Sequence, residues 1–518
     1  MVGGGAAGCV VASYIAENTK ASVALIEAGK SDWDPLIHMP AGSAKILEYE
    51  WHVWKDSTTP QFGTVMPYLS GKVLGGGSSI NAMCYVRGQR RDYDSWQSAV
   101  GNTGKWSFDD LLPHFIAQEK NDTFHDKYHG IDGGLAVTVA DNINELNKRC
   151  MKAFQEYGLP YNADYNGASQ IGVSPVHRTI GDNKRCSSAD AYLRPHIESG
   201  RVKLFTECTV TKVLMEDGKA VGVEYVEDDA FKKLFANATI LSAGTTHSPK
   251  ILMHSGVGPA DHLKAFGIKV VVDSPEVGEN LADHPVTPVV SYVKGDMGYQ
   301  SLTRGAGMIG AGMRYIFMGD GPVASNGIET LSHWNPDDFT AEPTIQCYHI
   351  PLIEAQMGGY RSGLTLDMIV LQPKSKGWLR LADKDPLSMP FINPNFLTHP
   401  EDLKAMVGAI KEARKVFTQP SLRDLMEEEY TPGSHVQTDA ELGEWARKAA
   451  QTMWHPVGTC RMGNDSRAVV DARLRVNGVE NLRVIDASIM PNIVSANTNA
   501  PVQALARHAA QMLVEDYR

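Results

Sequence analysis

A glycine-rich turn at the start of the chain constrains its fold more than any other feature. Gly3, Gly5 and Gly8 follow the pattern GxGxxG, and an apolar, helix-like segment leads from them to residues 22–29, SVALIEAG. This order is typical of a dinucleotide-binding βαβ unit. In such a unit the first glycine permits the tight turn, the second lets a pyrophosphate approach the backbone, and the third lets the helix pack closely.

The residues after the turn support this interpretation. The helix would present unpaired N–H groups and a partial positive charge to the phosphates. Glu27 would lie at the carboxyl end of the strand, where it can accept hydrogen bonds from ribose hydroxyls. A lone GxGxxG is weak evidence, since tight turns are common in a chain with 48 glycines. The turn, helix, strand and acid together favour adenine-dinucleotide binding.

One part of the unit is short. Only Met1 and Val2 precede Gly3, whereas the first strand of such a sheet is central and apolar. We therefore expect that residues are missing before Met1, or that the start has been placed too late.

Length and net charge limit the number of domains and the classes of partner that we expect. A chain of 518 residues exceeds a single-core domain, so we expect two domains. The net charge of −11 argues against nucleic acid or an anionic membrane surface as a partner. No apolar run approaches the roughly 18 residues of a membrane helix, so we expect no integral membrane segment.

Cysteine and histidine usage predicts neither disulfides nor a metal site. The seven cysteines are scattered without CxxC pairs, which is typical of reduced thiols in a cytoplasmic protein. The 17 histidines show no HExxH pattern or clustered ligand spacing, so we expect no metal.

Apolar periodicity predicts mixed helices and strands. An Asp217-Gly218 turn joins two strand patterns into a hairpin, and ATILSAG (residues 238–244) would return to the parallel sheet. A helix is expected from Pro400 to Phe417. Near the end of the chain, a strand leads to Asp486, and Pro501 would start the last helix at its first-turn position.

A second glycine-rich loop lies at residues 71–88, GKVLGGGSSINAMCYVRG. Three glycines and two serines before an apolar segment indicate a loop that approaches a phosphate or a ring. A flexible linker is the plain alternative, but linkers do not run directly into Ile80, Met83 and Tyr85.

Residues 71–94, the stretch GTTHSPKILMHSGVG at 244–258, and the terminal HPVGTCRMG and NTNAP segments resemble the glucose-methanol-choline (GMC) family of flavin oxidoreductases. The resemblance covers nearly the whole chain. It implies FAD rather than NAD, and alcohol oxidation by proton abstraction and hydride transfer to flavin N5. The implied fold is mixed α/β: a Rossmann-like FAD-binding domain, with a substrate domain built on an antiparallel sheet flanked by helices.

The resemblance also implies domain boundaries. Residues 1–290 would form the FAD-binding region, with a substrate-domain insertion near 140–190. Residues 291–455 would form most of the substrate domain, and residues 456–518 would return to the FAD-binding domain.

Site residues are carried over from the matching motifs. The implied catalytic pair is His455 and Asn499. Some members attach the flavin through a histidine at the position of Ile80, so here FAD should be non-covalent. The residues implied to hold FAD are Gly3, Gly5, Gly8, Glu27, Gly75, Gly76, Ser78, Asn81, Ala82, Val210, Asp486, Ala487, Asn497 and Pro501.

The chemistry fits these residue types. Histidine, with an unperturbed pKa of about 6.5, can take the hydroxyl proton while hydride leaves carbon, and an asparagine amide can stabilise the developing alkoxide. The plain alternatives are a structural histidine and a helix-entry asparagine. Trp454, His349 and His38 could line the pocket, although core or loop roles fit them equally.

The stretches LIHMPAG, NGASQ and GPVAS look most like L-sorbose dehydrogenase and pyridoxine oxidase within the family, and choline members look more distant. We therefore expect a small polar primary alcohol of the sugar, polyol or pyridoxine type. The electron acceptor would be oxygen or a quinone-type carrier. Choline or another alcohol as substrate, NAD-dependent hydride transfer, and an FAD-binding protein without catalysis stay open as alternatives.

Overall fold

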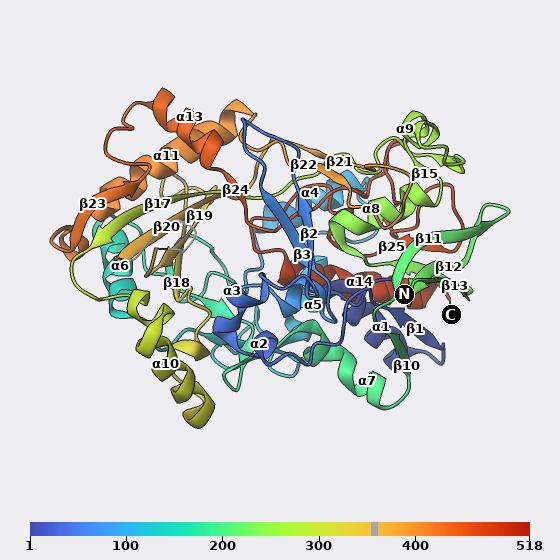
Figure 1. Ribbon diagram of the computed structural model, residues 1–518, viewed down its shortest axis with the longest axis horizontal. Helices are drawn as coiled ribbons and strands as arrows, with labels where there is room; N and C mark the ends of the chain where they lie inside the picture. Colours follow the sequence, from blue (N-terminus) through green and yellow to red (C-terminus); the bar gives the residue numbers. More distant parts are fainter. Residues whose placement is uncertain (354–360, 518) are drawn as a thin grey trace.

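The computed structural model describes residues 1–353 and 361–517. It places a parallel sheet near both chain termini and a larger antiparallel sheet at the other end of the molecule (Figure 1). Separate clusters of buried apolar side chains pack around the two sheets. This arrangement confirms the predicted fold class, a Rossmann-like domain joined to a domain built on an antiparallel sheet.

The parallel sheet surrounds the first residues of the chain. Val2 forms parallel bridges with Ile26 on one side and with Leu241 on the other, so it lies between two strand pairs. Its backbone N–H donates to the carbonyl of Ile240 at 2.9 Å. The two pairs are β1 (Val23–Ile26) with β10 (Val202–Phe205) and β14 (Thr239–Leu241) with β25 (Leu482–Val484).

Two helices pack together beside this sheet, α1 (Ala6–Asn18) and α14 (Asn499–Asp516). Most residues of both helices are buried, which explains their nearly continuous apolar and small side chains. The last helix begins two residues earlier than expected, because α14 starts at Asn499 and Pro501 is its third residue. Proline is tolerated there because the first-turn amides have no partner within a helix.

The predicted hairpin at Asp217-Gly218 is confirmed. Both residues have positive φ, 46° and 79°, as the tight turn between two antiparallel strands requires. The strands form a three-stranded sheet of β11 (Thr209–Glu216), β12 (Lys219–Glu227) and β13 (Ala230–Phe235).

The antiparallel sheet forms the other half of the molecule. Its strands follow the order β23-β17-β20-β19-β18-β6, with β24 also pairing with β17. Their bounds are β6 (Gly172–Pro175), β17 (Pro285–Val293), β18 (Thr330–Trp334), β19 (Ile345–Ile350), β20 (Gly363–Val370), β23 (Met426–Thr431) and β24 (Gln451–Thr452).

Helices α6 (Glu145–Glu156), α11 (Pro400–Phe417) and α13 (Asp439–Ala449) contribute apolar side chains to the cluster beside this sheet. The predicted helix from Pro400 to Phe417 is confirmed, with Pro400 at its start. Side chains of alternate residues point to opposite faces of a strand. One face of the sheet therefore packs on these helices, and the other can contribute to a site.

Two further segments border that site. The hairpin of β2 (Val53–Ser57) and β3 (Pro67–Gly71) lies near the centre of the view, and α10 (Gly305–Met318) projects at the lower left (Figure 1). Across the described ranges, no helix combines the length and the hydropathy needed to span a membrane.

Candidate active site

A cavity of about 1750 Å³ is lined by residues of both halves. This volume exceeds the roughly 300–1,000 Å³ of a pocket for one small molecule, so a dinucleotide and a substrate can share it. The predicted site residues Gly8, Gly75 and Pro501 do not line it. Those that do are Gly3, Gly5, Glu27, Gly76, Ser78, Asn81, Ala82, Val210, His455, Asp486, Ala487, Asn497 and Asn499.

The two glycine-rich loops touch each other at one end of the cavity. The backbone N–H of Gly75 donates to the carbonyl of Gly4 at 2.7 Å. A Cβ added to Gly76 would lie 2.7 Å from Cα of Gly5, whereas one added to Gly5 would meet nothing closer than 3.8 Å. Gly5 therefore faces open space, as a backbone that a ligand approaches must. Gly8 has the predicted packing role, since its Cβ would lie 1.9 Å from the carbonyl oxygen of Gly3.

The N-terminus of α1 fits a phosphate group. Its cap residue, Gly5, has no side chain, and the first turn carries no acidic residue. The first-turn residues Ala6 and Ala7 line the cavity, and such amides have no partner within the helix. Unpaired donors and the helix dipole together favour an anion there.

Glu27 closes this end of the cavity and is buried. One carboxylate oxygen accepts from the N–H of Gly4 at 2.7 Å and the other from the N–H of Gly29 at 2.8 Å. Burial raises the pKa of Glu27 to about 7, although these backbone donors lower it. Each oxygen keeps a lone pair that can accept from a ribose hydroxyl.

Asp486 connects the stretch at residues 244–258 with the end of strand β25. Its Oδ2 accepts from the N–H of Gly244 at 3.0 Å and from Oγ of Ser248 at 2.5 Å, and its Oδ1 accepts from the N–H of Ser488 at 2.8 Å. Asp486 is thus a buried acceptor that shapes the cavity wall beside Ala487.

A buried carboxylate, that of Asp283, fixes the backbone of His455. Its N–H donates to Oδ1 of Asp283 at 2.9 Å, while Oδ2 of Asp283 accepts from Tyr68 at 2.8 Å and from Thr452 at 2.5 Å. Tyr68 belongs to β3, so the hairpin at the cavity edge and the histidine share one buried carboxylate. Burial raises the pKa of Asp283 to about 6, and the hydrogen bonds it accepts oppose that shift.

His284 determines which nitrogen of His455 is available. Nε2 of His284 lies 3.0 Å from the carbonyl oxygen of Leu371, which can only accept, so Nε2 carries the hydrogen. Burial lowers the pKa of His284 to about 4, so the ring is neutral and its Nδ1 is an acceptor. The Nδ1–H of His455 donates to it at 3.0 Å. Nε2 of His455 is therefore unprotonated and can accept a proton.

The electrostatics of His455 favour the same state. Burial and, second, the neighbouring His284 lower the pKa of His455 well below its usual value of 6.5. The ring is neutral at neutral pH, as a general base must be before it acts.

An amide adjoins this nitrogen, but it belongs to Asn497. Nδ2 of Asn497 lies 3.2 Å from Nε2 of His455 and 2.5 Å from the hydroxyl of Tyr348. Within the described ranges no hydrogen bond joins His455 to Asn499, which differs from the predicted pairing. Asn499 is the first residue of α14 and lines the cavity from there.

Other histidines and Trp454 lie in different surroundings. Trp454 and His247 line the cavity. His349 is buried against Thr330 and Ser332 instead, and His38 is not part of the cavity lining.

Sequence reasoning missed Asp283, His284 and Tyr348. The first two stand together just before Pro285, where β17 begins, but no spacing rule connects them with His455 across more than a hundred and fifty residues. Their proximity follows from the pairing of β24 with the start of β17 and from the antiparallel bridge between Ala282 and Val457.

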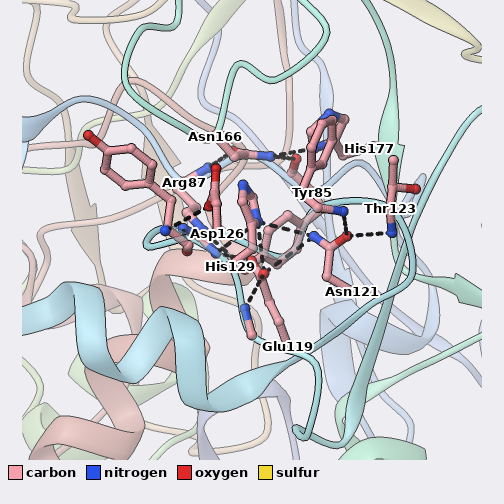
Figure 2. A network of polar contacts seen from close by, with 12 residues as sticks. Tyr85, Arg87, Glu119, Asn121, Thr123, Asp126, His129, Asn166 and His177 are labelled. Atoms are coloured by element: carbon pink, nitrogen blue, oxygen red, sulfur yellow. Dashed lines mark hydrogen bonds and ion pairs between the residues drawn. The ribbon is translucent and has the colours of Figure 1, made fainter.

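A network of polar contacts surrounds Arg87, Glu119 and His129, and Arg87 lies at the end of the second glycine-rich segment (Figure 2). Arg87 pairs with Glu119, and His129 bridges Glu119 and Asp164 at 3.0 and 3.1 Å. Burial alone would lower the pKa of His129, but the hydrogen bonds to Asp164 and Glu119 raise it to about 9. A charged His129 thus balances the negative charges of Glu119 and Asp164. The ion pair of Arg87 with Glu119 attaches the end of the segment 71–88 to this network.

Comparison with known proteins identifies the family. Models of the GMC oxidoreductase family match residues 1–286 and residues 373–506. The chain belongs to the GMC oxidoreductase family. The resemblance inferred from the motifs is confirmed, and this GMC oxidoreductase acts on CH–OH groups with FAD as its cofactor.

Two relatives show the breadth of the family. Alcohol dehydrogenase [acceptor] of Pseudomonas putida is 39% identical over 99% of this chain and 95% of its own length. Mitochondrial choline dehydrogenase of Homo sapiens is 35% identical over 99% of this chain and 89% of its own. Choline dehydrogenases are therefore not remote from this GMC oxidoreductase.

Solved structures agree on the fold. Pyridoxine 4-oxidase, described as from Mesorbium loti, has a TM-score of 0.91 and 30% identity, covering 99% of this chain and 98% of its own. An Aspergillus oryzae RIB40 formate oxidase variant, studied for FAD modification, has a TM-score of 0.93 and 27% identity, covering 100% and 97%.

Proposed function

We propose that this GMC oxidoreductase oxidises a primary alcohol to the aldehyde, with His455 as the general base. The observation that carries the proposal is the contact between His455 and His284, from which we infer that Nε2 of His455, at the cavity wall, carries no hydrogen. We propose Asn497 as the donor to the alcohol oxygen, because its amide already lies 3.2 Å from that nitrogen. Asn499, the residue expected from the sequence, is the alternative donor.

In the proposed reaction, Nε2 of His455 accepts the hydroxyl proton and the amide of Asn497 stabilises the negative charge on oxygen. Bound FAD would supply the acceptor for the hydride that leaves the carbinol carbon. The imidazolium formed on His455 keeps its Nδ1–H bond to neutral His284. Because that acceptor is uncharged, the histidine can return its proton more easily than a histidine paired with a carboxylate.

The same residues support a dissociable cofactor. Ile80 lines the cavity and has only a hydrocarbon side chain, so it offers no nucleophile. The glycine-rich turns, the first-turn amides of α1 and Glu27 would hold the phosphates and ribose of FAD without a covalent bond.

The cavity wall favours an alcohol with a largely apolar body. On the side of the antiparallel sheet, the apolar Ile328, Ile350 and Leu352 line it beside the polar Asn326, Tyr348 and Asp367. One N–H of Asn326 is engaged, because its Nδ2 donates to the carbonyl of Ala82 at 2.7 Å. Of the small polar alcohols expected from the sequence, the pyridoxine type therefore fits better than a sugar or polyol.

Choline is the second candidate, and one observation favours it. Tyr348 and Asp367 are paired neighbours on β19 and β20, and both line the cavity. An aromatic face and a carboxylate are the groups that bind a quaternary ammonium.

Anaerobic reduction of the bound flavin by a panel of alcohols tests the proposal. We expect bleaching with an aryl or alkyl primary alcohol, or with pyridoxine, and slower bleaching with sorbitol. Choline as the best reductant would support the second candidate, and no bleaching by any alcohol would support a protein without catalysis. Reoxidation by oxygen and by a soluble quinone, followed separately, distinguishes the two predicted classes of acceptor.

A further inference from the structure

Helix α10 exposes an unusual number of large apolar side chains. Ala311 is its one buried residue, whereas Ile309, Ile316 and Phe317 are 64%, 69% and 72% exposed. Met308, Met313 and Met318 are also exposed. Contiguous apolar patches on a protein surface mark interaction sites, since leaving them in water is unfavourable.

These side chains form a stripe. Ile309, Met313 and Ile316 follow the i, i+4, i+7 spacing, which places them on one side of a helix, with Met308 and Phe317 at its edges. Fourteen residues give a length of about 21 Å, less than the roughly 30 Å hydrocarbon core of a bilayer. The helix can therefore lie on a membrane surface but cannot cross it.

The charges around the stripe match phospholipid headgroups. Residues 299–318 contain Arg304 and Arg314 but no acidic residue, although the whole chain carries a net charge of −11. Arg314 pairs with Asp320, just beyond the helix, at 2.7 Å. Two α10 helices packed against each other would bring their basic side chains together. A phospholipid surface would instead offer phosphates to these side chains. The net charge argued against an anionic membrane surface, but residues 299–318 themselves carry no acidic side chain.

The stripe is continuous with the active-site cavity. Met308 is exposed on α10 and also lines the cavity, together with Ala311, Leu302 and Val323. An apolar molecule can therefore pass from the outer surface of the helix to the cavity along apolar side chains. A soluble protein bound to the stripe would close this opening to the cavity. A bilayer would instead supply apolar molecules to it.

We propose that α10 docks on the surface of a phospholipid bilayer, with Ile309, Met313 and Ile316 among the acyl chains and Arg314 near the phosphates. The alcohol then reaches the cavity from the lipid past Met308. This second statement rests on the proposed function, whereas the docking does not.

Flotation of the FAD-loaded protein with vesicles tests the docking. The vesicles contain phosphatidylcholine alone or with phosphatidylglycerol. We expect the parent to float with both. A double variant, Ile309→Gln with Ile316→Gln, should lose at least about tenfold in partitioning, because two large apolar side chains no longer enter the acyl region. Phe231→Gln with Phe235→Gln is the matched control, since these residues of β13 are 63% and 66% exposed, and it should float like the parent.

Several results would overturn the docking. A parent protein that stays in solution with both vesicles contradicts it, as does an equal loss in the stripe variant and the β13 control. Sedimentation velocity identifies the rival occupant: a dimer that Ile316→Gln dissociates, without vesicle binding, would show that α10 binds a second copy. The phosphatidylglycerol arm tests Arg314, because Arg314→Gln should reduce binding there more than to phosphatidylcholine alone.

The access route has its own measurement. Flavin reduction by a long-chain alcohol held in vesicles should be slower in the stripe variant than in the parent, at least about tenfold, in line with its lost partitioning. Reduction by a short, water-soluble alcohol should be unchanged. Equal rates for the vesicle-held alcohol would refute the route and leave the docking intact. Vesicle binding without reduction by any alcohol would refute the proposed function alone.

Discussion

Nδ1 of His455 lies 3.0 Å from Nδ1 of His284, and this contact determines which nitrogen of His455 can act as a base. Two neutral histidines can share it only if one nitrogen donates and the other accepts. The carbonyl of Leu371 assigns the donor role to Nε2 of His284, so Nδ1 of His455 must carry the hydrogen. The proposed base is therefore oriented by a neutral residue rather than by a carboxylate.

Replacing His284 tests this orientation. His284→Leu removes the acceptor and leaves Nδ1–H of His455 buried without a partner, so we expect flavin reduction to slow by about 10- to 100-fold. His284→Asn can place its side-chain oxygen where Nδ1 was, and should stay within about tenfold of the parent. Single-turnover reduction measures both. Equal losses in the two variants would show that the size of the ring matters and its acceptor does not.

Asn497, just before α14, and Asn499, the first residue of α14, provide a matched pair. Asn497→Ala removes the amide beside Nε2 of His455, and should cost about 10²- to 10³-fold in reduction rate, as loss of one oxyanion donor does. Asn499→Ala, two residues away on the same cavity wall, should cost less than about tenfold. The reverse order would support the original assignment of Asn499. Flavin content should be measured in both, because Asn497 was also predicted to contact FAD.

The pH dependence of reduction follows from the lowered pKa of His455. Its neutral form is the active one, and burial places its pKa well below 6.5. The rate should therefore be constant from neutral pH upward and should fall in acid as His455 becomes protonated, with a midpoint below about 6.5. Stopped-flow reduction across this range measures the midpoint. A rise centred at or above neutral pH that disappears in His455→Ala would be inconsistent with a buried, neutral base.

Acid precipitation tests how the flavin is held. Since Ile80 offers no nucleophile, all yellow colour should pass into the supernatant when the protein is denatured. Colour that persists in the washed pellet would show a covalent bond to another residue. The supernatant can then be identified as FAD by its chromatographic mobility.

Much of the fold was predictable because its signals are local. The turn at Asp217-Gly218 needs positive φ, and the helix from Pro400 to Phe417 has its own start signal and apolar face, so each could be found from a few neighbouring residues. The position of Glu27 directly after strand β1 was predictable for the same reason. Motif, strand and acid lie within one short segment.

The catalytic contacts were less predictable because they join distant segments. The sequence indicated His455 but paired it with Asn499. Both asparagines of the NTNAP segment suit the role, and only the path of the chain into α14 determines which of them lies beside His455. His284 had no signal of its own. Its contact with His455 exists because β24 pairs with the first residues of β17, which is a property of the sheet.

Single-turnover reduction of the flavin in His455→Ala tests the central claim most directly. If Nε2 of His455 takes the hydroxyl proton, the variant should reduce about 10²- to 10⁴-fold more slowly than the parent with an accepted alcohol, the usual range for a positioned acid–base group. It should keep its full FAD content, because the glycine turns and Glu27 are unchanged. Reduction at the parent rate with FAD content intact would show that His455 is not the base.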